Sequence, residues 1–107
     1  MGYYPKQIFT TLGDGATYVG WGGEVYSPDT EPTPAMGSGH FPDEGIGHAA
    51  YIRQLYALDK YYAPIYIHEE QLQEHMSQPQ CYKSKYGGFS SQNDTGYYML
   101  YGGPPRC

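Results

Sequence analysis

The segment YVGWGGEVYS, residues 18–27, decides the fold class of this chain. Aromatic and β-branched residues surround a pair of glycines that is followed at once by a glutamate. Such residues suit a pleated strand, whereas glycine reaches backbone angles that other residues avoid. The pattern therefore predicts a strand over 16–21 that bulges or breaks at the glycines and continues over 24–26.

Glu24 in this segment is the first candidate for chemistry. It follows Gly22 and Gly23, and Trp21 is the only tryptophan of the chain. Because glycine has no Cβ, a second backbone or a substrate can approach closely, and the carboxylate is presented beside a flat apolar wall. This setting suits a carboxylate that acts on a peptide or a sugar. A twisted, bulged strand with a solvated glutamate is the alternative, and it stays open.

The composition supports an all-β fold. The chain has 107 residues, which is enough for one small domain or for part of a larger one. It contains 14 Tyr, 15 Gly and 9 Pro, and only 16% of its residues are charged. These proportions argue against a helical bundle and favour short strands that are joined by tight turns.

Charge and hydropathy exclude several classes of partner. The net charge is -5, and the six Lys and Arg residues are scattered, which argues against nucleic-acid binding. No apolar run has the length of a bilayer span, so no membrane partner is expected. The first residues, MGYYPK, contain no apolar core of a signal peptide.

The other elements follow from apolar runs and turn residues. We predict a helical turn near Ile8, loops over 27–35 and 36–47, and a strand over 48–58. After these come an edge strand over 61–67 around Pro64, a short helix or a loop over 68–78, an extended piece from Cys81, a loop over 86–96 and a strand over 97–101.

Other reactive side chains give weaker signals. Glu44, beside Asp43, is a second candidate carboxylate, with a solvated turn as the alternative. The spacing of His40, Asp43, Glu44 and His48 matches no standard zinc signature, so neither a metal nor a cofactor is expected. The chain contains no serine-nucleophile elbow and no phosphate-binding loop. The two cysteines are compatible with a disulfide or with free thiols.

Several of these motifs occur in one order along the chain: GYYP (2–5), GWGGEV (20–25), MGSGHFPDEG (36–45), AAYIR (49–53), CY (81–82) and YGGP (101–104). In this order they closely resemble the C-terminal part of the neprosin domain, a plant family. The resemblance covers nearly the whole chain. Residues 1–107 are accordingly expected to form the C-terminal portion of a neprosin-type catalytic domain.

The resemblance implies a secreted glutamic endopeptidase that cleaves proteins or peptides next to proline. It implies an antiparallel two-sheet sandwich around a cleft, of which this chain would form an incomplete half. One of the two catalytic glutamates falls on Glu24, and we expect substrate contacts from Trp21, Gly22, Gly23 and His40. A disulfide between Cys81 and Cys107 is also implied.

The chain departs from the family pattern in one chemically important way. The second glutamate lies in the first half of the family's domain, which this sequence lacks, and Glu31, Glu44 or Glu70 would replace it only by coincidence. The expected partner is then a missing N-terminal half-domain. The alternative is a truncated, non-catalytic protein that binds peptide or a partner through its Tyr- and Gly-rich surface.

Overall fold

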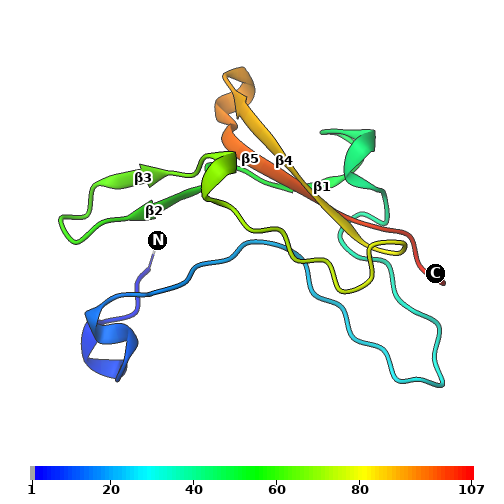
Figure 1. The fold of residues 1–107 in the computed structure, drawn as a ribbon, viewed down its shortest axis with the longest axis horizontal. Helices are drawn as coiled ribbons and strands as arrows, with labels where there is room; N and C mark the ends of the chain where they lie inside the picture. Colours follow the sequence, from blue (N-terminus) through cyan, green and yellow to red (C-terminus); the bar gives the residue numbers. More distant parts are fainter. Residues whose placement is uncertain (1) are drawn as a thin grey trace.

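The computed structural model describes residues 2–107, and these form an antiparallel all-β structure (Figure 1). The strands are β1 (Ala50–Ile52), β2 (Tyr56–Leu58), β3 (Pro64–Tyr66), β4 (Lys83–Ser90) and β5 (Gly96–Gly102). The described residues also form 3-10 helices of three residues each: η1 (Lys6–Ile8), η2 (Leu12–Asp14) and η3 (Pro42–Glu44) before β1, η4 (Glu69–Gln71) between β3 and β4, and η5 (Gln92–Asp94) between β4 and β5. The predicted fold class is confirmed.

The larger sheet has the strand order β1-β5-β4, and β5 lies at its centre. Ala50 pairs with Tyr101 on one side of β5, and Lys83 pairs with Gly102 on the other. The register of β4 shifts between Tyr86 and Gly88. This bulge depends on glycine, because Gly88 has a φ of +83° and a Cβ added at Gly87 would overlap the Tyr98 ring.

The smaller sheet is the β2–β3 hairpin, which projects away from the larger sheet (Figure 1). Its turn is held by Asp59, whose Oδ1 accepts hydrogen bonds from the backbone N–H of Tyr61 and of Ala63. Pro64 opens β3, an edge position where its missing N–H costs no ladder hydrogen bond. The predicted edge strand around Pro64 is confirmed.

The core lies where the two sheets meet. Leu55, Ile67 and Met99 form the buried cluster, and Leu55 is only 1% exposed. Half-buried side chains pack around this cluster: Trp21, Ile52, Tyr86, Tyr97 and Tyr101. The segment that carries Trp21 is therefore attached to the core by its side chain.

The predicted strand over 16–21 and 24–26 is wrong. These residues are extended, but they belong to no strand, and among residues 2–107 no backbone hydrogen bond joins them to another segment. A strand requires a neighbour that accepts and donates in register. Figure 1 shows this segment as a long coil that runs below the sheets.

Two further boundaries differ from the prediction. The loop expected over 86–96 is shorter, because β4 continues through its glycine bulge to Ser90 before η5 turns the chain into β5. The single strand expected over 48–58 is divided into β1 and β2 at Gln54, which has a φ of +53°. The chain passes from one sheet to the other at this residue.

The strand predicted over 97–101 is confirmed as β5, and the extended piece after Cys81 is β4. Residues 68–78 contain only η4 and are otherwise irregular. No helix within residues 2–107 combines the length and the apolar character that crossing a bilayer would need.

Candidate functional site

A cleft with a volume of about 1050 Å³ lies between the extended segment and the larger sheet. One wall is formed by residues 17–27 and the other by residues 71–78. Side chains of β4 and β5 form its floor, among them Lys83, Tyr86 and Tyr101. Trp21, Gly22, Gly23 and Glu24 all line this cleft, so the structure brings together four of the predicted site residues.

Trp21 attaches the wall to the core. Its ring is half-buried against the cluster of Leu55, Ile67 and Met99. Burial of a large aromatic ring contributes strongly to packing, so Trp21 fixes one point of a segment that lacks backbone pairing.

Gly23 provides a second fixed point, because its backbone lies directly against Tyr101 and Met36. A Cβ added at Gly23 would lie 2.7 Å from Cδ2 of the Tyr101 ring and 2.8 Å from Sδ of Met36. Met36 is itself held to the end of β5 by a bridge to Gly103, with N–O distances of 3.0 and 3.3 Å. The backbone before Glu24 therefore lies against the sheet because residue 23 has no side chain.

Replacing Gly23 with alanine is expected to displace this wall. The added methyl must push the Tyr101 ring aside, and such overpacking costs about 1–3 kcal/mol. Gly22→Ala is the matched control, since a Cβ at Gly22 meets nothing within 4 Å. Denaturant unfolding checks the stability difference, and Trp21 fluorescence checks the displacement. Equal behaviour of the two variants would mean that the contact of Gly23 with Tyr101 does not hold the wall.

Glu24 follows this contact and is exposed to the cleft. Within residues 2–107 its carboxylate takes part in no ion pair and accepts no hydrogen bond. A carboxylate in this state can accept a proton or a hydrogen bond from a bound molecule, but nothing in the described chain orients it.

Two further carboxylates line the same cleft, and the sequence did not single them out. These are Glu69 of η4 and Glu74. Glu74 Oε1 accepts a hydrogen bond from Ser84 Oγ at 2.7 Å, which ties the irregular wall to β4. The glutamates considered from sequence as replacements, Glu31, Glu44 and Glu70, do not line the cleft.

Tyr86 links the cleft floor to the core. Its hydroxyl donates to the carbonyl of Ile67 at 2.6 Å. Burial raises the pKa of Tyr86, and the nearby Tyr97, Glu69 and Glu70 act in the same direction. The phenol therefore stays protonated, and its hydrogen bond persists, well into alkaline solution.

His40 lies outside the cleft, in a separate polar cluster around η3. Its Nδ1 is 2.9 Å from Oε1 of Glu44, and its ring makes an edge contact with His48 at 6.0 Å between centroids. Oε2 of Glu44 accepts a hydrogen bond from the N–H of Phe41 at 2.8 Å, which caps the start of η3. Asp43 pairs with Lys85 of β4 at 3.0 Å. The Asp43–Lys85 pair thus attaches η3 to the larger sheet.

The hydrogen bond to His40, followed by that from Phe41 N–H, lowers the pKa of Glu44 below its ordinary value of 4.5. A carboxyl whose pKa is lower in the folded state stabilises the fold above its unfolded pKa, and this contribution is lost as the pH falls through the folded pKa.

We therefore expect Glu44→Gln to be less stable than the parent protein at neutral pH, and the two to converge as the pH falls well below 4.5. Thermal unfolding across this pH range measures the difference. Glu31→Gln is the control, because the exposed side chain of Glu31 has no ion-pair partner within residues 2–107. A stability gap for Glu44→Gln that does not narrow in acid would contradict the assignment.

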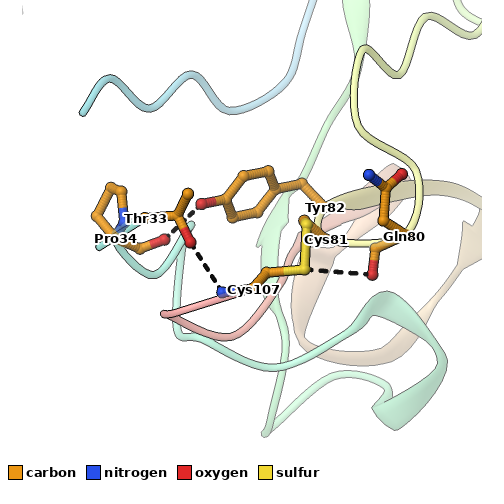
Figure 2. Close-up of a disulfide and its surroundings, with 6 residues drawn as sticks. All are labelled: Thr33, Pro34, Gln80, Cys81, Tyr82 and Cys107. Atoms are coloured by element: carbon orange, nitrogen blue, oxygen red, sulfur yellow. Dashed lines mark hydrogen bonds between the residues drawn. A yellow bond between two sulfur atoms is a disulfide. The ribbon is translucent and has the colours of Figure 1, made fainter. Parts of the chain in front are cut away.

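A disulfide joins Cys81, two residues before β4, to Cys107 in the C-terminal tail. Figure 2 shows the bond beside the proline-rich loop, at Thr33 and Pro34. Cys107 N donates to Thr33 Oγ1 at 2.8 Å, and Tyr82 Oη donates to the carbonyl of Pro34 at 2.7 Å (Figure 2). The loop that follows Glu24 is thereby tied to the start of β4 and to the C-terminal tail. The pairing is the one that the family resemblance implied.

No group of three or more His, Cys, Asp or Glu residues is arranged to hold a metal ion in the described part of the chain.

The sequence matches the profile of a protein family. The profile of the family described as Neprosin matches residues 1–104, which includes the cleft and both of its walls.

Proposed function

Because this chain belongs to the neprosin family, we propose that it forms the C-terminal part of a glutamic endopeptidase domain in which Glu24 is one of two catalytic carboxylates. The observation that carries this proposal is the position of Glu24. It lines the cleft, has no ion-pair partner within residues 2–107, and stands on a backbone that Trp21 and Gly23 fix against the sheet.

The proposed chemistry is general acid–base hydrolysis. One carboxylate removes a proton from a water molecule as its oxygen attacks the scissile carbonyl carbon. A second, protonated carboxyl group donates its proton to the departing amine nitrogen when the C–N bond breaks. The two groups need opposite protonation states, which two different environments provide.

We propose that the second carboxylate comes from polypeptide outside residues 1–107, in a partner half-domain. Within residues 2–107 no backbone hydrogen bond joins residues 16–27 to another segment. This supports the proposal, because an extended segment with free N–H and C=O groups is a ready template for another strand. Such a strand would complete a sheet on the cleft wall and carry its own side chains towards Glu24.

For the substrate we propose a protein or peptide that contains proline, bound along Trp21, Gly22 and Gly23. The cleft wall offers the aromatic face of Trp21 for an apolar ring, and its two glycines let a peptide backbone approach closely. His40 lies outside this cleft, so a substrate contact from His40 would require a peptide that extends to η3. We also propose secretion, with which the disulfide is compatible because such bonds persist in oxidising compartments.

A non-catalytic role is the second candidate. It is favoured by one observation: within residues 2–107 no side chain orients the Glu24 carboxylate. In this role the cleft would bind an extended peptide without cleaving it.

The experiment that separates these roles is complementation. Residues 1–107 are produced in an oxidising host and mixed with the first half of a complete neprosin domain. Cleavage of a quenched, proline-containing peptide is then followed at acid pH, with the same peptide carrying alanine for proline as the control. We expect each half alone to be inactive and the mixture to cleave beside proline. A mixture that forms a complex and binds the peptide without cleaving it would favour the non-catalytic role.

A further inference from the structure

A second concave surface lies between the β2–β3 hairpin and the turn that joins β4 to β5. We call it the aromatic groove. Its volume is about 840 Å³, and it shares no lining residue with the Glu24 cleft. Its residues are Gln54, Tyr56, Leu58, Pro64, Tyr66, Phe89, Ser90, Ser91, Asp94, Gly96 and Tyr97.

The floor of the aromatic groove consists of aromatic rings that pack against one another. Tyr97 of β5 packs against the core cluster, and its ring also contacts Tyr66 at 5.8 Å and Phe89 at 5.2 Å between centroids. Three strands thus contribute one aromatic ring each to a continuous surface. Edge and tilted contacts of this kind hold the rings in place without a ligand.

The aromatic side chains that form the walls of the groove are exposed to solvent. Tyr56 is 46% exposed, Tyr66 is 52% exposed and Phe89 is 65% exposed. Tyr56 and Tyr66 are cross-strand partners of the hairpin, with ring centroids 6.4 Å apart. Contiguous exposed aromatic surface on a small protein marks an interaction site.

The hydroxyls of Tyr56 and Tyr66 remain available to a ligand. The buried Tyr82 and the half-buried Tyr86 donate theirs to backbone carbonyls, whereas no hydrogen bond within residues 2–107 engages those of Tyr56 and Tyr66. A proline-rich segment in the polyproline conformation has no internal hydrogen bonds, so its carbonyls are free to accept from such donors. Its pyrrolidine rings fit between aromatic side chains, which is how aromatic grooves recognise it.

The negative charge of Asp94 in the aromatic groove favours proline-rich segments that carry a basic residue. Asp94 is the only charged residue in its lining and forms no ion pair within the described residues. Nearby Arg53 donates instead to the carbonyl of Asn93, at 3.3 Å, and does not line the groove. A lysine or arginine beside the prolines would therefore find a free carboxylate.

From these contacts we infer that the aromatic groove binds an extended, proline-rich segment of another protein that carries a basic residue next to its prolines. This site is independent of the chemistry proposed for Glu24. It lies on different residues, and binding there requires no catalysis.

The test uses the isotope-labelled chain and a synthetic polyproline peptide with an arginine at each end. NMR titration should move the amide signals of Ser90 and Gly96, and their shifts give the Kd. We expect Tyr66→Ala to weaken binding about tenfold, because buried aromatic contacts dominate such interfaces. Tyr61→Ala is the matched control: Tyr61 is 75% exposed and lies on the same hairpin, outside the groove. Its effect should stay within about twofold.

A second variant removes the charge of the groove without disturbing the local backbone. Asp94→Asn retains a residue that tolerates the positive φ of +56° at this position. Loss of one exposed charge pair should weaken binding of the arginine peptide about threefold. A Gly-Ser peptide with the same terminal arginines should bind much more weakly. The inference is overturned if Ser90 and Gly96 do not respond, if the Gly-Ser peptide binds equally well, or if only a soluble oligosaccharide shifts these signals.

Discussion

Glu24→Gln is expected to reduce peptide cleavage by the complemented domain by at least about 10²-fold, the usual contribution of one acid–base group. The amide has nearly the same shape as the carboxylate but can neither accept nor release the proton. Since the Glu24 side chain has no partner within residues 2–107, its replacement should leave the fold unchanged. Initial rates with the quenched proline peptide measure the effect.

Glu74→Gln is the control for this experiment. Glu74 lines the same cleft, but its carboxylate is engaged by Ser84 at 2.7 Å. We expect its replacement to change the rate by much less than that of Glu24. If Glu74→Gln abolished cleavage and Glu24→Gln did not, the catalytic assignment would move to the opposite wall of the cleft.

Removal of the disulfide is expected to have the largest effect on stability. The bond closes a loop between residues 26 positions apart, and chain-entropy arguments give about 3–4 kcal/mol for a loop of this size. This is a large fraction of the stability of a small domain. The Cys81→Ser, Cys107→Ser double variant should therefore unfold at much lower denaturant concentration.

Reductant provides the internal control for this prediction. It should shift the unfolding midpoint of the parent protein to that of the double variant, and it should leave the double variant unchanged. Because the tail also holds Thr33, in the loop that directly follows the cleft wall of residues 17–27, we expect Trp21 to become more exposed in both cases. A parent protein whose midpoint does not respond to reductant would show that the bond is not needed for the fold.

Local sequence signals were sufficient for much of the sheet. The aromatic run of β5 and the edge position of Pro64 were predicted because strand propensity and the missing proline N–H act within a few residues. The glycines at 87 and 88 indicated a loop, yet they form a bulge. The difference arises because β5 places the Tyr98 ring across that point, and no local pattern specifies it.

Sequence signals pointed to only one wall of the cleft, residues 17–27. The glycine–glutamate pattern identified Glu24 and its neighbours, and the family resemblance supplied the disulfide pairing. Glu69 and Glu74 were missed because they lie in a polar, irregular segment whose position depends on contacts with the sheet. The strand expected over 16–21 was wrong for a similar reason, since pairing depends on a neighbour that a propensity does not specify.

The most direct test of the site is the fluorescence of Trp21 during titration of residues 1–107, carrying Glu24→Gln, with a proline-containing peptide. Trp21 is the only tryptophan of the chain and lines the cleft, so excitation beyond the tyrosine band reports this site alone. We predict a saturable change in its emission that Tyr66→Ala in the aromatic groove leaves unaltered. Absence of any change, while the groove amides still respond to peptide, would contradict the assignment of the Glu24 cleft as the peptide-binding site.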